Sequence, residues 1–312
     1  MKTNKSSKVS ICIPTYNYAH FLSQTIESVL SQTFSDFELL IVDNCSTDNT
    51  SDVVKKYSNS DQRITYFRNE SNLGMVGNWN RCLQLATGEY IKILCADDLL
   101  EPLCIERSVI MLEANPNVIL VTGARLLINE SLLPMGTLAF SHTLQIISGF
   151  EVINKCLVYG NLIGEPSAAM FRRNNAGQVF NSHYKQLMDL EMWFRLLEQG
   201  DLASLPEVLC KFRLHSAQGT NASVRSLSFA DDDFLLLKEY MKKDYITLSL
   251  IQKQIARFNK AYIIWDRRGC YSFKKMVQKM SQHYSLILFV FLFVVLKIKG
   301  ALLRLFVKRM NR

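Results

Sequence analysis

The sequence predicts an α/β protein with a mostly parallel sheet, helices on both faces of that sheet, and a helical appendage at the C-terminal side. Two observations predict this class. Short apolar runs of strand length alternate with segments of helical period as far as Thr122, and a polar loop follows most of the runs. Of the 312 residues, 48% are hydrophobic and 21% charged, as is typical of a globular chain and not of a disordered one.

The expected strands of the first half are short apolar runs rich in β-branched residues. They are residues 9–14, 37–43, 64–68, 90–94 and 118–122. The segments between them carry apolar residues at helical spacing and are expected to be crossover helices, over residues 21–32, 50–57, 75–86 and 102–114.

From Leu126 to His215 the pattern is mixed. A helix is expected from the N-cap Ser148 to Val158, another over 187–200 with Gly200 ending it, and strands over 168–171 and 207–215. A polar loop follows over 216–223, and then helical segments over 233–243 and 250–265. The sequence therefore predicts a main domain over residues 1–220 and a helical appendage over residues 221–284.

The last segment, residues 285–312, is expected to contact a membrane. Leu286–Leu296 is an uninterrupted apolar run, and the residues after it include Lys and Arg but no acid. The run is shorter than the roughly 20 residues that a spanning helix needs, so a helix lying on an anionic bilayer surface fits it better. The alternative is a helix packed on the protein or on another subunit.

Since the N-terminus lacks the apolar segment of a signal peptide, the main domain is expected in the cytoplasm, peripherally associated with the inner face of the cell membrane.

Polar residues gather directly after the expected parallel strands. The segment Pro14–Asn17 follows the first strand, Asp43 ends the second, Arg68 ends the third, and the stretch CADD, Cys95–Asp98, follows the fourth. Ligands of an open parallel sheet bind beyond the carboxyl ends of its strands. These loops should therefore face one crevice.

The carboxylates of this crevice predict a cation. Asp43, Asp97 and Asp98 would repel one another in a confined space unless a cation or hydrogen-bond donors stabilise them. Mg²⁺ and Mn²⁺ are typically bound through one or two carboxylates together with substrate phosphates. The loops also have a structural interpretation, in which Ser46 and Thr47 cap a helix.

Taken together, these motifs resemble the inverting glycosyltransferases of family 2, enzymes of the GT-A fold that transfer sugars from nucleotide diphosphate donors. The resemblance is carried, in family order over about the first 220 residues, by VSICIPTYNYAHFLSQTIESVLSQTF, FELLIVDNCSTDNT, NLGMVGNWNRCLQLATGEYIKILCADD, MDLEMWFRL and FRLHSAQGT. It implies a nucleotide-sugar donor, expected to be UDP-linked, and Mn²⁺ or Mg²⁺ as cofactor. It also implies a glycan or lipid-linked acceptor of the kind used in bacterial surface-polysaccharide synthesis.

The resemblance implies roles for single residues. Asp98 is the expected metal ligand, Asp97 should face the ribose or donor sugar, and His215 could add a metal or phosphate contact. Arg213 belongs to the segment that closes over the donor diphosphate. The nucleotide should lie against the loops that follow the first three strands, at Pro14, Thr15, Tyr16, Asn17, Asp43, Arg68, Asn72 and Gly74, with Asp43 accepting a hydrogen bond from the base.

Two positions depart from the common family form. Cys95 stands where the family often has a first Asp, and Asn44 replaces a frequent second Asp after the second strand. The remaining adjacent pair, Asp97 and Asp98, suffices for one divalent ion.

Inversion by a single displacement needs a base that deprotonates the acceptor hydroxyl. The segment MDLEMWFRL matches the family segment that supplies it, with Asp189 as the expected base and Glu191 as the alternative. Residues two apart on a helix point about 200° apart, so only one of the two can face the crevice. Both could instead be solvated acids stabilised by the helix dipole.

Other functions fit less well. A Rossmann dehydrogenase needs a GxGxxG turn after its first strand, and PTYNYAH contains no glycine. A nucleic-acid protein is not expected, because the excess charge, +8 at pH 7, is partly concentrated behind the apolar run of the tail. The eight cysteines are scattered singly, without the spacing of a zinc site. A non-catalytic nucleotide- or glycan-binding member of a membrane-bound assembly stays as the alternative.

Overall fold

The computed structural model describes residues 7–176, 179–216, 218, 228–266 and 272–282. They form two compact units: the first lies within Met1–Cys156 and Asn161–Ser216, the second within Leu157–Gly160 and Ala217–Arg312. The expected tail over 285–312 and most of the expected polar loop over 216–223 lie outside the described residues.

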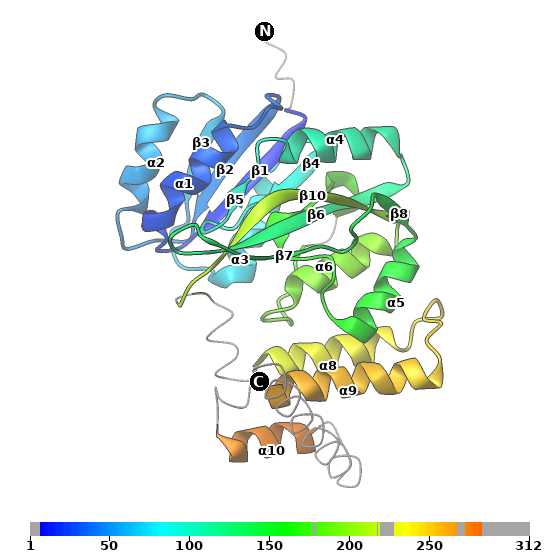
Figure 1. Cartoon of the computed structure of the whole chain (residues 1–312). Helices are drawn as coiled ribbons and strands as arrows, with labels where there is room; N and C mark the ends of the chain where they lie inside the picture. Colours follow the sequence, from blue (N-terminus) through cyan, green and yellow to red (C-terminus); the bar gives the residue numbers. More distant parts are fainter. Residues whose placement is uncertain (1–6, 177–178, 217, 219–227, 267–271, 283–312) are drawn as a thin grey trace, which may run out of the picture. The chain divides into compact units, whose positions relative to one another are not determined.

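The first unit contains one ten-stranded sheet with the order β3-β2-β1-β4-β9-β6-β10-β5, and β7 and β8 pair with β6 and β10 (Figure 1). The first four strands in this order are parallel, and β6 and β10 are parallel to each other. The bounds are β1 Val9–Thr15, β2 Phe37–Asp43, β3 Ile64–Arg68, β4 Tyr90–Ile93, β5 Leu99–Leu100, β6 Val118–Asn129, β7 Pro134–Leu138, β8 Gln145–Ile147, β9 Ala169–Arg172 and β10 Asp201–Leu214.

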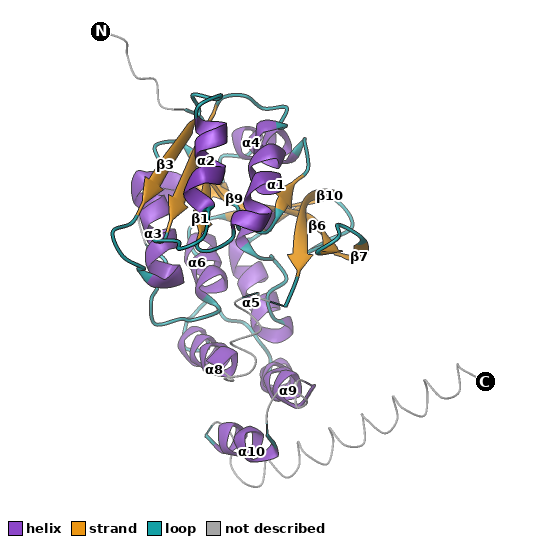
Figure 2. Ribbon diagram, turned by 90° about the vertical axis from the view of Figure 1, so that its left-hand side faces the viewer, coloured by secondary structure: helices purple, strands orange, loops and turns teal. Residues whose placement is uncertain are grey.

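Helices cover both faces of this sheet (Figure 2), as the sequence predicts. One face carries α1 Ala19–Leu30, α2 Thr50–Ser58 and α4 Cys104–Ala114, whose apolar residues share one core with the strands. The other face carries α3 Gly74–Leu85 and α6 Met188–Leu197. The remaining helices of this unit are α5 Gly149–Tyr159, which ends beyond its boundary, and the 3₁₀ turns η1 Pro166–Ala168 and η2 Arg173–Ala176.

The two-sided cover explains why the strands read as continuous apolar runs. In β1, alternate residues such as Ile11 and Ile13 belong to the core of the α1 face. Between them, Cys12 points the other way and its thiol contacts the carbonyl of Cys82 in α3. In α1, Leu22, Ile26 and Val29 are fully buried at helical spacing.

The structure differs from the expected fold at several places. β9 runs antiparallel between β4 and β6, and β10 begins at Asp201, before the expected start at residue 207. The short strands β5, β7 and β8 and the helix α10 were not expected. All residues of β7 are exposed, so β7 lacks the buried alternation by which a strand is recognised.

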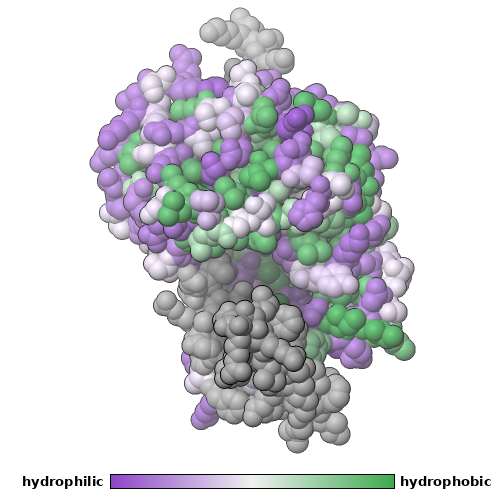
Figure 3. All heavy atoms as spheres, viewed as in Figure 1, coloured by the Kyte–Doolittle hydropathy of each residue, from purple (hydrophilic) through white to green (hydrophobic). Residues whose placement is uncertain are grey.

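In Figure 3, hydrophobic and hydrophilic residues are mixed on the face where Figure 1 draws β6, β7 and β10.

The second unit contains the helical appendage. Its helices are α8 Ser228–Tyr240, α9 Leu250–Asp266 and α10 Phe273–Ser281. A small core joins them through Phe229, Ala261, Ile264 and Met276. Among the helices that the structure describes, none combines the length and the hydropathy required to cross a membrane.

Candidate active site

The carboxyl ends of β1, β2 and β3 bring three predicted residues side by side. Thr15, Asp43 and Arg68 are register partners across these strands. Thr15 is buried, whereas the next residue, Tyr16, is 42% exposed at the mouth of the sheet. The residues predicted to contact the nucleotide thus lie together, with Pro14 and Thr15 in the strand and Tyr16 accessible; that they bind a nucleotide stays a prediction.

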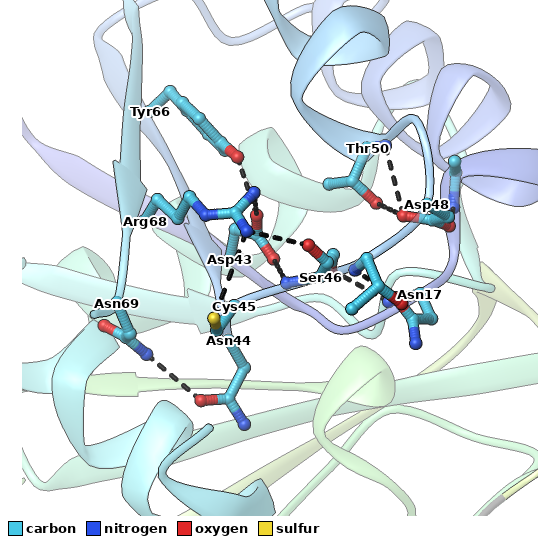
Figure 4. Close-up of polar contacts among 12 residues, drawn as sticks. Asn17, Asp43, Asn44, Cys45, Ser46, Asp48, Thr50, Tyr66, Arg68 and Asn69 are labelled. Atoms are coloured by element: carbon cyan, nitrogen blue, oxygen red, sulfur yellow. Dashed lines mark hydrogen bonds and ion pairs between the residues drawn. The ribbon is translucent and has the colours of Figure 1, made fainter. Parts of the chain in front are cut away.

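Asp43 is fully buried and anchors this edge (Figure 4). Its Oδ1 accepts a hydrogen bond from the Ser46 amide at 2.9 Å, and its Oδ2 accepts one from the Tyr66 hydroxyl at 2.6 Å. Arg68 Nη1 lies 3.5 Å from the same Oδ2. Burial and the charge of Asp43 raise the pKa of Tyr66 to about 12, so the phenol remains a donor. A contact of Asp43 with a nucleotide base stays a prediction.

The loop after β2 is fixed by two further polar residues (Figure 4). Asn17, with a left-handed φ of 57°, donates its amide to Ser46 Oγ and accepts from the Thr47 amide. Asp48 accepts the amide of Ala19 at the start of α1 and that of Thr50 at the start of α2. The N-cap positions are Tyr18 and Asn49, so neither Ser46 nor Thr47 caps a helix, and the two oxygens of Asp48 accept the first amide of each helix.

Asn44 explains one departure from the family form. Its amide nitrogen donates to Asn72 Oδ1 at 2.8 Å and to the Gly74 carbonyl at 3.2 Å, and its oxygen accepts the Leu73 amide at 2.8 Å. An Asp has no such donor when ionised. Gly74 begins α3 with φ 72°, in the left-handed region that favours glycine. Asn44 thus holds the predicted donor loop, Asn72 and Gly74 included, against the end of β2.

In the CADD stretch the two acids have different surroundings. Asp98 is fully buried; its Oδ2 accepts the Ser167 hydroxyl at 2.5 Å and its Oδ1 the Arg213 amide at 2.9 Å. Burial and the neighbouring charge of Asp97 raise the pKa of Asp98 well above its ordinary value. Asp97 Oδ2 instead lies 2.9 Å from Nε2 of His215. The structure therefore brings the predicted His215 to Asp97, and it gives both oxygens of Asp98 protein partners.

Arg213 clamps this loop. Its Nε donates to the Asp97 carbonyl at 2.7 Å, its Nη2 to Gln24 Oε1 at 2.7 Å and its Nη1 to the Glu130 carbonyl at 3.3 Å. The guanidinium also lies 4.5 Å from the centre of the Phe21 ring. Arg213 is fully buried, so its observed contacts are internal, and a direct contact with the donor stays a prediction.

The donor atoms of this cluster fit a divalent ion. Ligand atoms of Cys95, Asp97 and Asp98 lie within 4.8 Å of one another, and the imidazole of His215 adjoins Asp97. Carboxylate oxygens suit Mg²⁺ and Mn²⁺, and an added imidazole nitrogen suits the transition metal better. The residues present therefore fit the predicted cofactor.

Asp189 and Glu191 both lie in the first turn of α6 and are both buried. Glu191 is engaged by Arg195 through two contacts, at 2.8 and 3.0 Å. Asp189 Oδ1 accepts only the Leu190 amide, at 2.7 Å, among the contacts of the described residues. Burial raises the pKa of Asp189 to about 7, the range in which a carboxylate can act as a general base.

Several residues of the site carry no recognisable motif in the sequence. Ser167 accepts the Cys95 amide while its hydroxyl donates to Asp98. Lys92, buried within the apolar run of β4, donates to the Ser167 carbonyl at 2.6 Å. The sequence signal for these residues is the lysine inside an apolar run, because a buried charge requires a polar partner.

Comparison with known proteins identifies a family for this chain. The model of the family "Glycosyl transferase family 2" matches residues 10–180, more than half of the chain. A curated relative, the putative teichuronic acid biosynthesis glycosyltransferase TuaG of Bacillus subtilis, is 29% identical over 68% of this chain and 81% of its own length. An uncharacterized glycosyltransferase of Haemophilus influenzae is 28% identical over 67% of this chain. The match spans 66% of the length of that relative.

Two solved structures share the fold. The S. aureus TarS 1-349 complex with UDP-GlcNAc has a TM-score of 0.56 at 16% identity and covers 81% of this chain and 80% of its own. The mannosyltransferase PcManGT of Pyrobaculum calidifontis, in complex with GDP-Man and Mn²⁺, has a TM-score of 0.58 at 17% identity. The match covers 96% of this chain and 81% of the mannosyltransferase chain. The predicted GT-A fold is thus confirmed, and with the family match over residues 10–180 the chain belongs to glycosyl transferase family 2.

Proposed function

We propose that this glycosyltransferase moves a sugar from a UDP-linked donor to a hydroxyl of a glycan or lipid-linked acceptor, with inversion, in the synthesis of a bacterial surface polysaccharide. The observation that carries the proposal is the proximity of two features, since the charge of Asp189 acts on Cys95 in the CADD stretch. These are a carboxylate–imidazole pair suited to a metal ion, Asp97 with His215, and a buried carboxylate whose pKa is near neutrality, Asp189. The UDP-GlcNAc bound by TarS and the name of TuaG support the donor and the pathway class.

In this proposal Asp189 takes the proton from the acceptor hydroxyl. The acceptor oxygen then forms a bond to the anomeric carbon of the sugar, while the bond from that carbon to the diphosphate breaks and the nucleoside diphosphate leaves. Glu191 is unsuited to this step because Arg195 holds both of its oxygens. A single displacement inverts the anomeric configuration.

We propose a set of metal ligands that differs in part from the expected one. Each oxygen of Asp98 accepts one hydrogen bond, from Ser167 or from Arg213, whereas Asp97 and His215 face each other through a hydrogen bond that an ion can replace. We therefore assign the ion to Asp97 and His215, with Asp98 holding the loop from behind. When bound, the ion stabilises the negative charge of the departing diphosphate.

The decisive experiment is donor hydrolysis by the full chain with Mn²⁺, measured as nucleoside diphosphate released from a panel of UDP- and GDP-sugars. We expect one UDP-sugar to be turned over only with Mn²⁺, and Asp97→Ala to abolish this Mn²⁺-dependent turnover. Binding of a donor in a thermal-shift assay without turnover of any donor would instead favour the non-catalytic alternative.

The membrane partner rests on the sequence of the tail alone. The apolar run Leu286–Leu296 and the basic residues after it support contact with an anionic surface. Flotation with anionic liposomes, before and after deletion from Ser285, tests it, and unchanged flotation would contradict it.

A further inference from the structure

Arg125 and Glu165 form a charged pair that the mechanism above does not use. Arg125 lies in β6, and its Nε is 2.7 Å from Oε2 of Glu165, which directly precedes η1. The side chain of Arg125 is 6% exposed and that of Glu165 33%. Neither Nε nor Nη1 of Arg125, nor Oε2 of Glu165, makes a hydrogen bond within the described part of the chain. The pair therefore interacts through charge rather than through an aligned hydrogen bond.

Gly164 lies between Arg125 and α6, the helix that carries Asp189. Trp193 lies one turn after Asp189 on the same side of α6, and its indole Nε1 donates to the Gly164 carbonyl at 3.1 Å. Gly164 has φ 111°, and a β-carbon there would come within 2.8 Å of Arg125 Nη1. The glycine thus permits Arg125 to approach the segment that contacts the Asp189 side of α6.

We propose that Arg125 and Glu165 are positioning residues for Asp189, and that their opposite charges set how readily this carboxylate accepts the acceptor's proton. The inference rests on the function proposed above for Asp189. Its electrostatic basis is that burial raises the pKa of Asp189, the charge of Glu165 raises it further, and the charge of Arg125 lowers it. The two side chains therefore act on one carboxylate in opposite directions.

The other titratable groups around Asp189 do not supply this balance. On α6 itself, Glu191 and Arg195 form a two-contact pair and compensate each other. In the loop after β4, burial raises the pKa of the Cys95 thiol well above its ordinary value, so that thiol is neutral. Within the described residues, the charges named among the largest influences on the pKa of Asp189 are Glu165 before η1 and Arg125 on β6.

The test is the pH dependence of kcat/KM for UDP-sugar hydrolysis at saturating Mn²⁺, in which water replaces the unidentified acceptor. The acid limb of this profile reports the pKa of the base in the free enzyme. Glu165→Gln should move the limb to lower pH, and Arg125→Met should move it to higher pH, each by about one unit. The double variant should return it close to the wild-type position.

A matched control is Asp61→Asn. Asp61 Oδ2 lies 2.7 Å from Arg63 Nη2, the same separation, but this pair precedes β3 and so lies at the opposite end of the strand from the site. Its variant should keep the wild-type limb. Glu165→Gln is isosteric at a partly exposed position and tests the inference even if Arg125→Met does not fold.

Two results would overturn the inference. If the wild type hydrolyses a donor but both variants leave the limb in place, or move it in one direction, Arg125 and Glu165 have only a structural role. If the wild type hydrolyses no donor, the proposed function fails first, and the inference falls with it.

Discussion

Asp43 and Asp189 are both buried acids of the candidate site, yet their surroundings differ. Asp43 accepts from the Ser46 amide and the Tyr66 hydroxyl and lies beside Arg68. Asp189 accepts only the amide of its own neighbour, Leu190, among the contacts described. The comparison teaches that donors, and not burial alone, separate an acid that anchors loops from one that is available to take a proton.

The largest expected effect is on catalysis. Asp189→Asn keeps the shape of the side chain but removes the proton acceptor, so we expect kcat for donor turnover to fall by about 10³-fold. The measurement is nucleoside diphosphate release with Mn²⁺, with Asp61→Asn as a control that should retain wild-type activity. An Asp189→Asn enzyme within tenfold of the wild type would remove Asp189 from the mechanism.

The second effect is on stability and concerns the other acid. Asp43→Ala leaves a buried amide and a partly buried hydroxyl without an acceptor, so the free energy of unfolding should fall by about 3 kcal/mol. Arg68 adds little to this loss because its side chain is 45% exposed. Urea denaturation at neutral pH measures the change. If Asp43→Ala lowers the free energy of unfolding by less than Asp189→Ala does, Asp43 is not the acid that anchors the loops.

The third effect is a pH-dependent gain in stability. Asp189 has a pKa of about 7 in the folded chain and about 4 when unfolded. Between these values the folded state binds more protons, so this carboxylate makes the wild type less stable as pH rises. Asp189→Asn should therefore be more stable than the wild type by up to about 4 kcal/mol at about pH 8 and nearly equal to it below about pH 4. Denaturation curves of the metal-free proteins at both pH values would show a constant difference if the acid were solvated.

Much of the fold could be predicted because its elements have local signatures. The expected strand over 37–43 coincides with β2, and the expected helix over 50–57 differs from α2 by one residue. The antiparallel position of β9 was not predictable, because its short apolar run carries no information about its neighbours. β7 could not be predicted either, because all its residues are exposed and it has no buried alternation.

The site was predicted only in part. Motifs predicted Asp98 and His215 as metal ligands, Asp97 at the donor and Asp189 as the base, and the structure places His215 next to Asp97. Ser167 and Gln24 were not recognised, since Ser167 contacts Asp98 across 69 residues and Gln24 contacts Arg213 across 189. Such contacts depend on tertiary packing and leave no periodicity in the sequence.

The Arg213 clamp has a consequence for motion. One side chain ties the loop after β4, helix α1 and the turn after β6 to the end of β10. Opening of any one of these segments must break contacts that hold the others, so they should exchange their amide hydrogens as one cooperative unit. Substrate entry at this edge would then involve the end of β10 together with the loop, not the loop alone.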